Sequence, residues 1–160
     1  MTARRFVLAV AIVSLVALPS VARSRVRDDR PNLIGGELGG RGLIFTLNYE
    51  RFLSNDVGLG VGLMAIKVSG GGITMAPLYV SYVPGNTHSP YFAAGATLLA
   101  GGGDFQDWES TWVAHFSFGY QYQSPSGFFV RPFFTYLRPT ERGAGDEYLI
   151  WPGLTIGGSF

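Results

Sequence analysis

Tyr148-Leu149-Ile150-Trp151-Pro152-Gly153-Leu154-Thr155-Ile156-Gly157-Gly158-Ser159-Phe160 closes the chain, and its pattern decides the fold. Counting back from Phe160 in steps of two gives Gly158, Ile156, Leu154, Pro152 and Ile150. Because successive side chains of a strand point to opposite faces, this period of two predicts a β-strand with one apolar face. In a membrane barrel that face meets lipid and the other face meets the interior. The segment therefore predicts the closing strand of a membrane-spanning β-barrel.

Seven earlier segments alternate in the same way and are separated by Gly, Pro, Asn, Asp and Ser. The eight predicted strands are 32–39, 42–53, 56–67, 73–83, 90–101, 110–123, 127–138 and 148–160. The first is short and rich in glycine, but single-chain bacterial barrels normally have an even number of strands and both termini in the periplasm. We therefore predict an all-β fold, an eight-stranded antiparallel up-and-down transmembrane β-barrel.

The two faces of the predicted strands differ in polarity. In 110–123, the even positions are apolar or aromatic, as at Trp112 and Phe116, whereas His115, Ser117 and Gln121 share the opposite face. We expect the apolar face to meet lipid and the polar face to line the interior. A soluble, lipocalin-like periplasmic binder would show the reverse arrangement and is the main structural alternative.

The chain begins like a secreted protein. Arg4 and Arg5 precede an apolar run, which ends in small residues before Ala22. This pattern predicts a signal peptide over 1–22, because the apolar run is short of the roughly 20 residues that a spanning helix needs. Residues 23–31 are charged and predict a flexible periplasmic leader. The barrel would then occupy 32–160.

Composition excludes several classes of protein. The chain has 12 basic and 11 acidic residues, so its near-neutral charge gives no sign of nucleic-acid binding. It has no cysteine and only two histidines, which leaves neither a disulfide framework nor a metal site with recognisable ligand spacing. We expect no cofactor and no metal.

Three segments carry a family resemblance. They are "LNYERFLSNDVGLGVG" (47–62), "GYQYQSPSGFFVRPFFTYL" (119–137) and "WPGLTIGGSF" (151–160). Together with the signal peptide, they resemble the small outer-membrane β-barrel domain proteins of Gram-negative bacteria. The resemblance implies export through the periplasm, location in the outer membrane, and insertion by the outer-membrane assembly machinery with Phe160 as the signal. It implies no particular activity, because a fold does not fix a function.

Five polar residues are predicted to form a cluster in the lumen: Glu37, Glu50, His115, Ser117 and Arg131. The interior of an eight-stranded barrel is just wide enough for side chains to fill, so charges buried there must find partners. We expect a polar plug that contains Arg131 and one or both glutamates. The same groups could instead line a narrow channel for small solutes.

His115-Phe116-Ser117 is the one constellation with an enzymatic pattern. Residues two apart on a strand share a face, so the imidazole could take the proton of the hydroxyl. The pair is similar to the His-x-Ser of lipid A deacylases, which are also eight-stranded outer-membrane barrels. Those enzymes follow the serine with Asn, whereas Phe118 stands here, and the predicted parity puts the pair in the lumen. We expect no catalytic residues.

Four basic residues gather at the predicted extracellular strand ends: Arg41, Lys67, Arg138 and Arg142. Guanidinium and ammonium groups pair well with phosphate, which predicts contacts with lipopolysaccharide. The expected partners are therefore outer-membrane lipids, lipopolysaccharide and the assembly machinery, with the protein a monomer. The sequence favours a non-enzymatic barrel with an envelope-structural or surface-interaction role over the channel, the deacylase-like enzyme and the lipocalin-like binder.

Overall fold

The structure is a computed structural model that describes residues 26–68, 71–103, 106–140 and 148–160. The predicted signal peptide, 1–22, lies outside these residues. Within the described part of the chain, no helix is long and apolar enough to cross a membrane.

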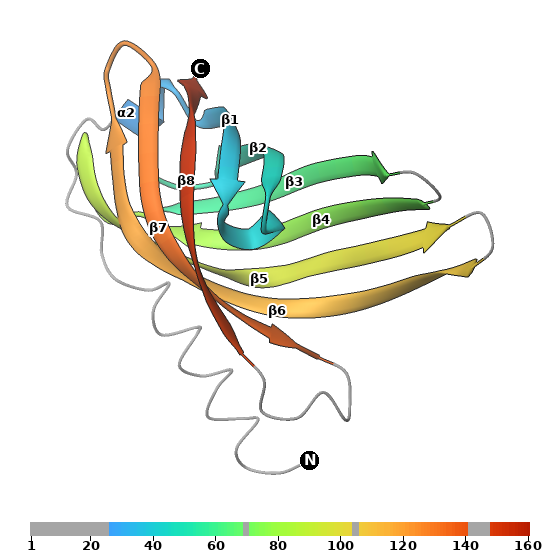
Figure 1. The fold of residues 1–160 in the computed structure, drawn as a ribbon. Coiled ribbons are helices and arrows are strands. Elements are labelled where there is room, and N and C mark those ends of the chain that lie inside the picture. Colours follow the sequence, from blue (N-terminus) through green and yellow to red (C-terminus); the bar gives the residue numbers. More distant parts are fainter. Residues whose placement is uncertain (1–25, 69–70, 104–105, 141–147) are drawn as a thin grey trace.

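Eight antiparallel strands close into a barrel in which each strand pairs with the next and β8 pairs with β1 (Figure 1). They are β1 (Asn32–Gly39), β2 (Phe45–Phe52), β3 (Val57–Val68), β4 (Gly71–Tyr82), β5 (His88–Gly103), β6 (Gln106–Gln123), β7 (Phe128–Pro139) and β8 (Leu149–Ser159). The predicted fold class is confirmed. We call the end where β1 begins and β8 ends the base, and the opposite end the rim.

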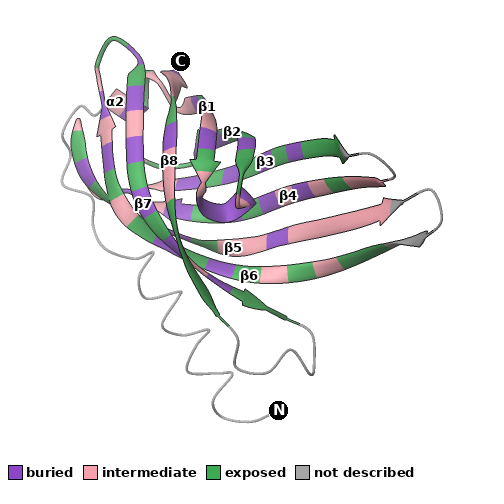
Figure 2. Cartoon of the chain, viewed as in Figure 1, coloured by how far each residue is buried: buried purple, intermediate pink, exposed green. Residues whose placement is uncertain are grey.

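Burial alternates along the strands, as Figure 2 shows. Large apolar side chains such as Leu47, Leu78 and Phe118 are exposed on the outside. Polar side chains of the intervening positions, such as Asn48 and Gln121, are buried inside. This is the pattern expected for a barrel surrounded by lipid and the opposite of the lipocalin-like alternative.

The wall of the barrel is uneven in height. β1 and β2 have 8 residues each, whereas β5 and β6 have 16 and 18. The short β1–β2 hairpin turns through η1 (Gly40–Gly42), a 3-10 helix, so that β2 begins at Phe45 and not at the predicted residue 42. Gly39 and Gly40 both have positive φ, 68° and 63°, which glycine adopts readily and which turns the chain inward.

A short helix at the base, α2 (Val26–Asp29), differs from the predicted flexible leader. The amide of Val26 donates to Asn86 Oδ1 over 2.9 Å, and Arg27 is only 2% exposed. Residues 26–29 of the predicted leader thus form a short helix, and the guanidinium of Arg27 binds the base of the barrel. Residues 23–25 lie outside the described part of the chain.

Candidate functional site in the barrel lumen

Three arginines from separate elements reach the interior of the barrel: Arg41 from η1, Arg131 from β7 and Arg27 from α2. Each is at most 2% exposed. A guanidinium is charged at every physiological pH, so each must be held by acceptors inside the protein. Each has its own set of partners, and the three lie in order from rim to base.

Arg41 forms the layer nearest the rim. Its guanidinium makes an ion pair with Glu37 of β1, and its backbone amide donates to Glu37 Oε1 over 2.8 Å. Its Nη1 also donates to the hydroxyl of Tyr91 over 3.0 Å, and its Cζ lies 3.7 Å from the ring centroid of Tyr79. Asn48 Nδ2 donates to Glu37 Oε2 over 3.0 Å. The inward turn of η1 thus plugs the lumen with a fully paired cation.

Arg131 forms the middle layer. Its Nη1 lies 2.7 Å from Glu50 Oε2 in a buried ion pair, and its Nε donates to Gln121 Oε1 over 2.8 Å. The Tyr91 ring centroid lies 4.1 Å from its Cζ, so this tyrosine contacts both upper arginines. Glu50 accepts two further hydrogen bonds, from Ser81 and from the hydroxyl of Tyr79. The two pairs are therefore joined through Tyr79 and Tyr91.

Arg27 closes the base. Its guanidinium donates to the carbonyls of Asn55 and Val83 over 2.9 and 2.8 Å, and also to the carbonyls of Gly85 and Asn86. Its Cζ lies 5.0 Å from the ring centroid of Phe52. The carbonyls belong to the β2–β3 and β4–β5 turns, so one side chain ties two turns together.

Glycines on β3 make room for these groups. A Cβ added to Gly60 would lie 2.1 Å from Cζ of Tyr79, and one added to Gly62 would lie 2.0 Å from Oδ1 of Asn48. Real side chains never approach so closely, so the large polar groups of the lumen depend on bare backbone opposite them.

His115 and Ser117 do not form a catalytic arrangement. Ser117 Oγ lies 2.8 Å from Thr135 Oγ1, across the β6–β7 pair. Both ring nitrogens of His115 lack a hydrogen-bond partner among the described residues. A general base must reach the hydroxyl proton that it takes, and the hydroxyl here is bonded to a threonine.

All five residues predicted for the lumen cluster are buried in the interior: Glu37, Glu50, His115, Ser117 and Arg131. Sequence reasoning missed Arg27, Tyr79 and Tyr91 as members of this network. Strand parity points both tyrosines inward and could have found them. No periodic signal precedes Arg27, because it lies before the first strand.

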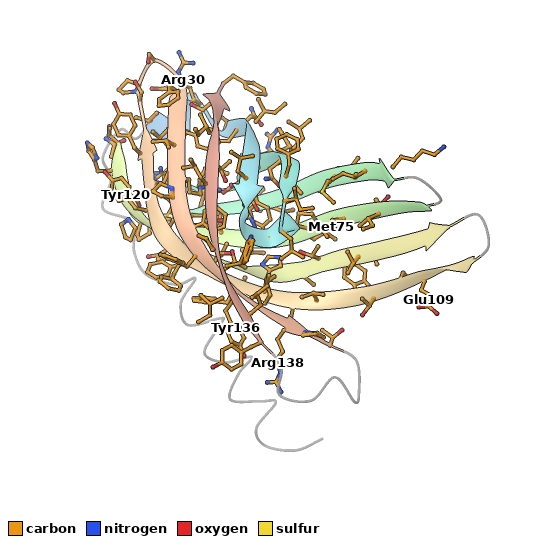
Figure 3. The ribbon with its side chains drawn as sticks, viewed as in Figure 1. Arg30, Met75, Glu109, Tyr120, Tyr136 and Arg138 are labelled. Carbon is orange, nitrogen blue, oxygen red and sulfur yellow. The ribbon has the colours of Figure 1, made fainter. Side chains whose placement is uncertain are left out.

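The residues predicted to contact lipopolysaccharide differ in their exposure. Arg41 is 1% exposed, so the predicted lipopolysaccharide contact of this residue is wrong. The turn η1 folds it into the lumen, where Glu37 neutralises it. Lys67 and Arg138 are exposed near the rim, as expected. Figure 3 shows Arg138 at this end of β7. Arg142 lies outside the described residues.

Phe160 is 59% exposed, and its amide donates to the carbonyl of Asn32 over 2.9 Å at the β1–β8 closure. Among the described residues, no group of histidine and acidic side chains could hold a metal ion.

No protein-family model matches this sequence, and no curated protein matches it either. Two solved structures are similar in fold. The N-terminal β-barrel domain of Pseudomonas aeruginosa OprF aligns with 80% of this chain and 98% of that chain, at 18% identity and a TM-score of 0.58. Ail, the attachment invasion locus protein of Yersinia pestis, aligns with 80% of this chain and 94% of that chain, at 15% identity and a TM-score of 0.46. The likeness to the OprF domain shows that this chain has the eight-stranded closed fold of outer-membrane barrels.

Proposed function

We propose that the protein is a non-enzymatic barrel of the outer membrane of a Gram-negative bacterium, with a sealed lumen and an envelope-structural or surface-interaction role. The observation that carries this proposal is the burial pattern: ion pairs lie inside a closed barrel and large apolar side chains lie outside. Such a surface is favourable in lipid and unfavourable in water. The base would face the periplasm and the rim the cell exterior. Outer-membrane lipids, lipopolysaccharide and the assembly machinery would be its partners, with the barrel as a monomer.

The layered lumen supports a sealed barrel over a solute channel. The Arg41–Glu37 and Arg131–Glu50 pairs are fully buried and are wedged between the rings of Tyr79, Tyr91, Phe129 and Phe133. An ion crossing this region would have to break two buried pairs, which costs several kcal/mol for each. We expect purified protein in planar lipid bilayers to show no steady conductance, whereas a channel would conduct and respond to Glu50→Gln.

The lumen also supports a non-enzymatic role. Ser117 is 0% exposed and bonded to Thr135, so it cannot reach an acyl ester in the outer leaflet. A deacylase would shift the mass of lipid A when the protein is overexpressed, and the shift would be lost on His115→Ala. We expect no such shift.

The experiment that tests the proposal is gel mobility of the mature chain, refolded in detergent, with and without boiling. We expect a folded species that migrates differently until it is boiled and that resists protease before boiling. A chain that stays soluble without detergent and shows one mobility would contradict membrane insertion and favour the lipocalin-like binder.

A further inference from the structure

The interior of the barrel changes polarity above η1. Below it, the inward positions carry the charged network. Above it, the inward positions of β3–β7 are more often apolar than polar. The apolar ones are Met64, Ile66, Ile73, Met75, Leu99, Val113 and Leu137, and the polar ones include Thr97, Glu109, Thr111 and His115. Ile66 and Ile73 remain 37% and 43% exposed on this inner face. Met75, labelled in Figure 3, is 6% exposed. An apolar compartment therefore lies above the polar plug, and the described side chains leave it open.

An open hollow of about 640 Å³ lies in this compartment, against the inner face of β4, β5 and β6. Its inward-facing lining includes Ile73 and Leu99, together with Thr111 and Glu109, which have the same strand parity on β6. The hydroxyl of Thr111 is buried and has no hydrogen-bond partner among the described residues. The hollow thus combines the apolar side chains of Ile73 and Leu99 with polar side chains of β6.

The wall of the compartment has a notch above the β1–β2 hairpin. Pairing of β3 with β2 ends at Leu63, and pairing of β8 with β1 ends at Gly153. Beyond these points β3 pairs only with β4 and β8 only with β7 among the described strands. The wall is therefore interrupted between β3 and β8 above the β1–β2 hairpin, where Figure 1 shows the two strands diverging. Spanning strands need about 9–11 residues, so a hairpin with 8-residue strands ends within the lipid layer.

The foot of the notch is an apolar groove. A hollow of about 590 Å³ there is lined by Leu38, Gly39, Leu43, Ile44, Trp151, Pro152, Gly153 and Leu154. Leu38 and Ile44 are 58% and 60% exposed, and the indole of Trp151 donates to the carbonyl of Leu43 over 2.9 Å. An exposed apolar groove therefore lies at the foot of the notch, beside the opening in the wall above η1.

The edges of the notch are poorly suited to an added β-strand. Pro152 on β8 has no amide to donate, and its carbonyl already lies against Gly39. On β3, Lys67 stands near the end of the free edge, and an edge lysine discourages pairing with another strand. The free amides of the β3 edge can instead donate to oxygens of a lipid headgroup, and Lys67 offers a cation for its phosphate.

From this geometry we infer that the notch is a lateral binding site for a membrane lipid, whose acyl chain lies in the apolar groove and extends into the outer lumen. The inference rests on the proposed insertion into the outer membrane. The lipid chain covers Ile66, Ile73 and Leu99, which otherwise face water, and so fills the gap that the short hairpin leaves in the wall.

Two adjacent leucines allow a sharp test. Leu98 and Leu99 are neighbours on β5, so they lie at nearly the same height in the barrel. Leu98 faces outward and Leu99 faces inward. The chain has no native cysteine, so a single label can be placed at either position. We would attach a nitroxide spin label to Leu98→Cys, Leu99→Cys and Ser126→Cys in phospholipid vesicles, after checking by gel mobility that each variant folds. Oxygen concentrates in hydrocarbon and a nickel chelate in water, so the ratio of their accessibilities reports what surrounds each label. Ser126, exposed in the β6–β7 turn, gives the value for water.

We expect the ratio at Leu99→Cys to match that at Leu98→Cys and to exceed that at Ser126→Cys. Adding Ile73→Arg to Leu99→Cys should lower the ratio to the Ser126 value, whereas Ile73→Leu should leave it unchanged. If the accessibility ratio at Leu99→Cys equals the value for water while the ratio at Leu98→Cys equals the value for lipid, the inference fails and membrane insertion stands. If both labelled sites give the value for water, the lipid site and membrane insertion are both contradicted. A label at Leu99 that is inaccessible to both reagents, or that becomes lipid-like only when free fatty acid is added, also overturns the inference.

Discussion

Glu50 and Arg131 show how a single residue pair shapes the lumen. Their charges are buried together, and Ser81, Tyr79 and Gln121 complete the hydrogen bonds of both groups. Removing both charges from such a pair is often neutral, whereas removing one leaves the other buried without a partner. We therefore expect the pair to matter more for the arrangement of the lumen than for net stability.

The first prediction follows from that asymmetry. Replacing one partner, by Glu50→Gln or Arg131→Met, should lower the free energy of unfolding by about 3–5 kcal/mol. The double variant should recover most of this loss. Urea unfolding in lipid vesicles, followed by tryptophan fluorescence, would give the coupling energy through a double-mutant cycle. Equal and additive losses would mean that the pair is not coupled.

A second prediction concerns the glycine beneath Tyr79. Gly60→Ala should destabilise the barrel by about 1–3 kcal/mol, because the new methyl group overlaps a ring held between Arg41 and Glu50. Gly101→Ala is the matched control, since a Cβ there would meet its nearest atom at 3.5 Å, an ordinary contact. The same unfolding assay measures both variants. Similar losses at the two sites would argue against a special role for Gly60.

At the scale of elements, the sequence predicts that each strand forms. It predicts less well the residues at which each strand begins and ends. Alternation of period two identifies each strand because lipid on one side and the lumen on the other enforce it. It says nothing of η1, where Gly39 and Gly40 turn the chain inward and carry Arg41 away from the surface. A basic residue beside a glycine turn has the same local sequence pattern whether it lies in the lumen or on the surface. The burial of Arg41 therefore depends on Glu37 and on the opposite wall of the barrel.

The helix at the base gives the third prediction. Arg27→Ala should destabilise the barrel by roughly 1–3 kcal/mol, because it leaves buried carbonyls of the β2–β3 and β4–β5 turns without donors. It should also speed protease cleavage before Asn32. Arg51→Ala is the control, because Arg51 is exposed on β2 and should change stability by less than about 0.5 kcal/mol. Unchanged cleavage in Arg27→Ala would mean that α2 is held by other contacts.

At the scale of the whole molecule, the lumen is polar toward the base and apolar toward the rim. The sequence pattern separates inside from outside, but it does not show how high each strand rises relative to its neighbours. That height depends on the register of all eight strands around the closed barrel, which places Leu99 above η1 and Arg131 below it. The notch and the apolar compartment therefore emerge only when the barrel is closed.

The orientation of the closed barrel gives the final prediction. Glu109 lies at the rim on β6, where Figure 3 labels it, and Ser126 lies at the base in the β6–β7 turn. With the base in the periplasm, a membrane-impermeant maleimide should label Glu109→Cys in intact cells and should label Ser126→Cys only after the outer membrane is permeabilised. The absence of native cysteine removes background labelling. The reverse pattern would invert the proposed orientation and place the lipid notch in the inner leaflet. Labelling of both sites in intact cells would contradict insertion across the membrane.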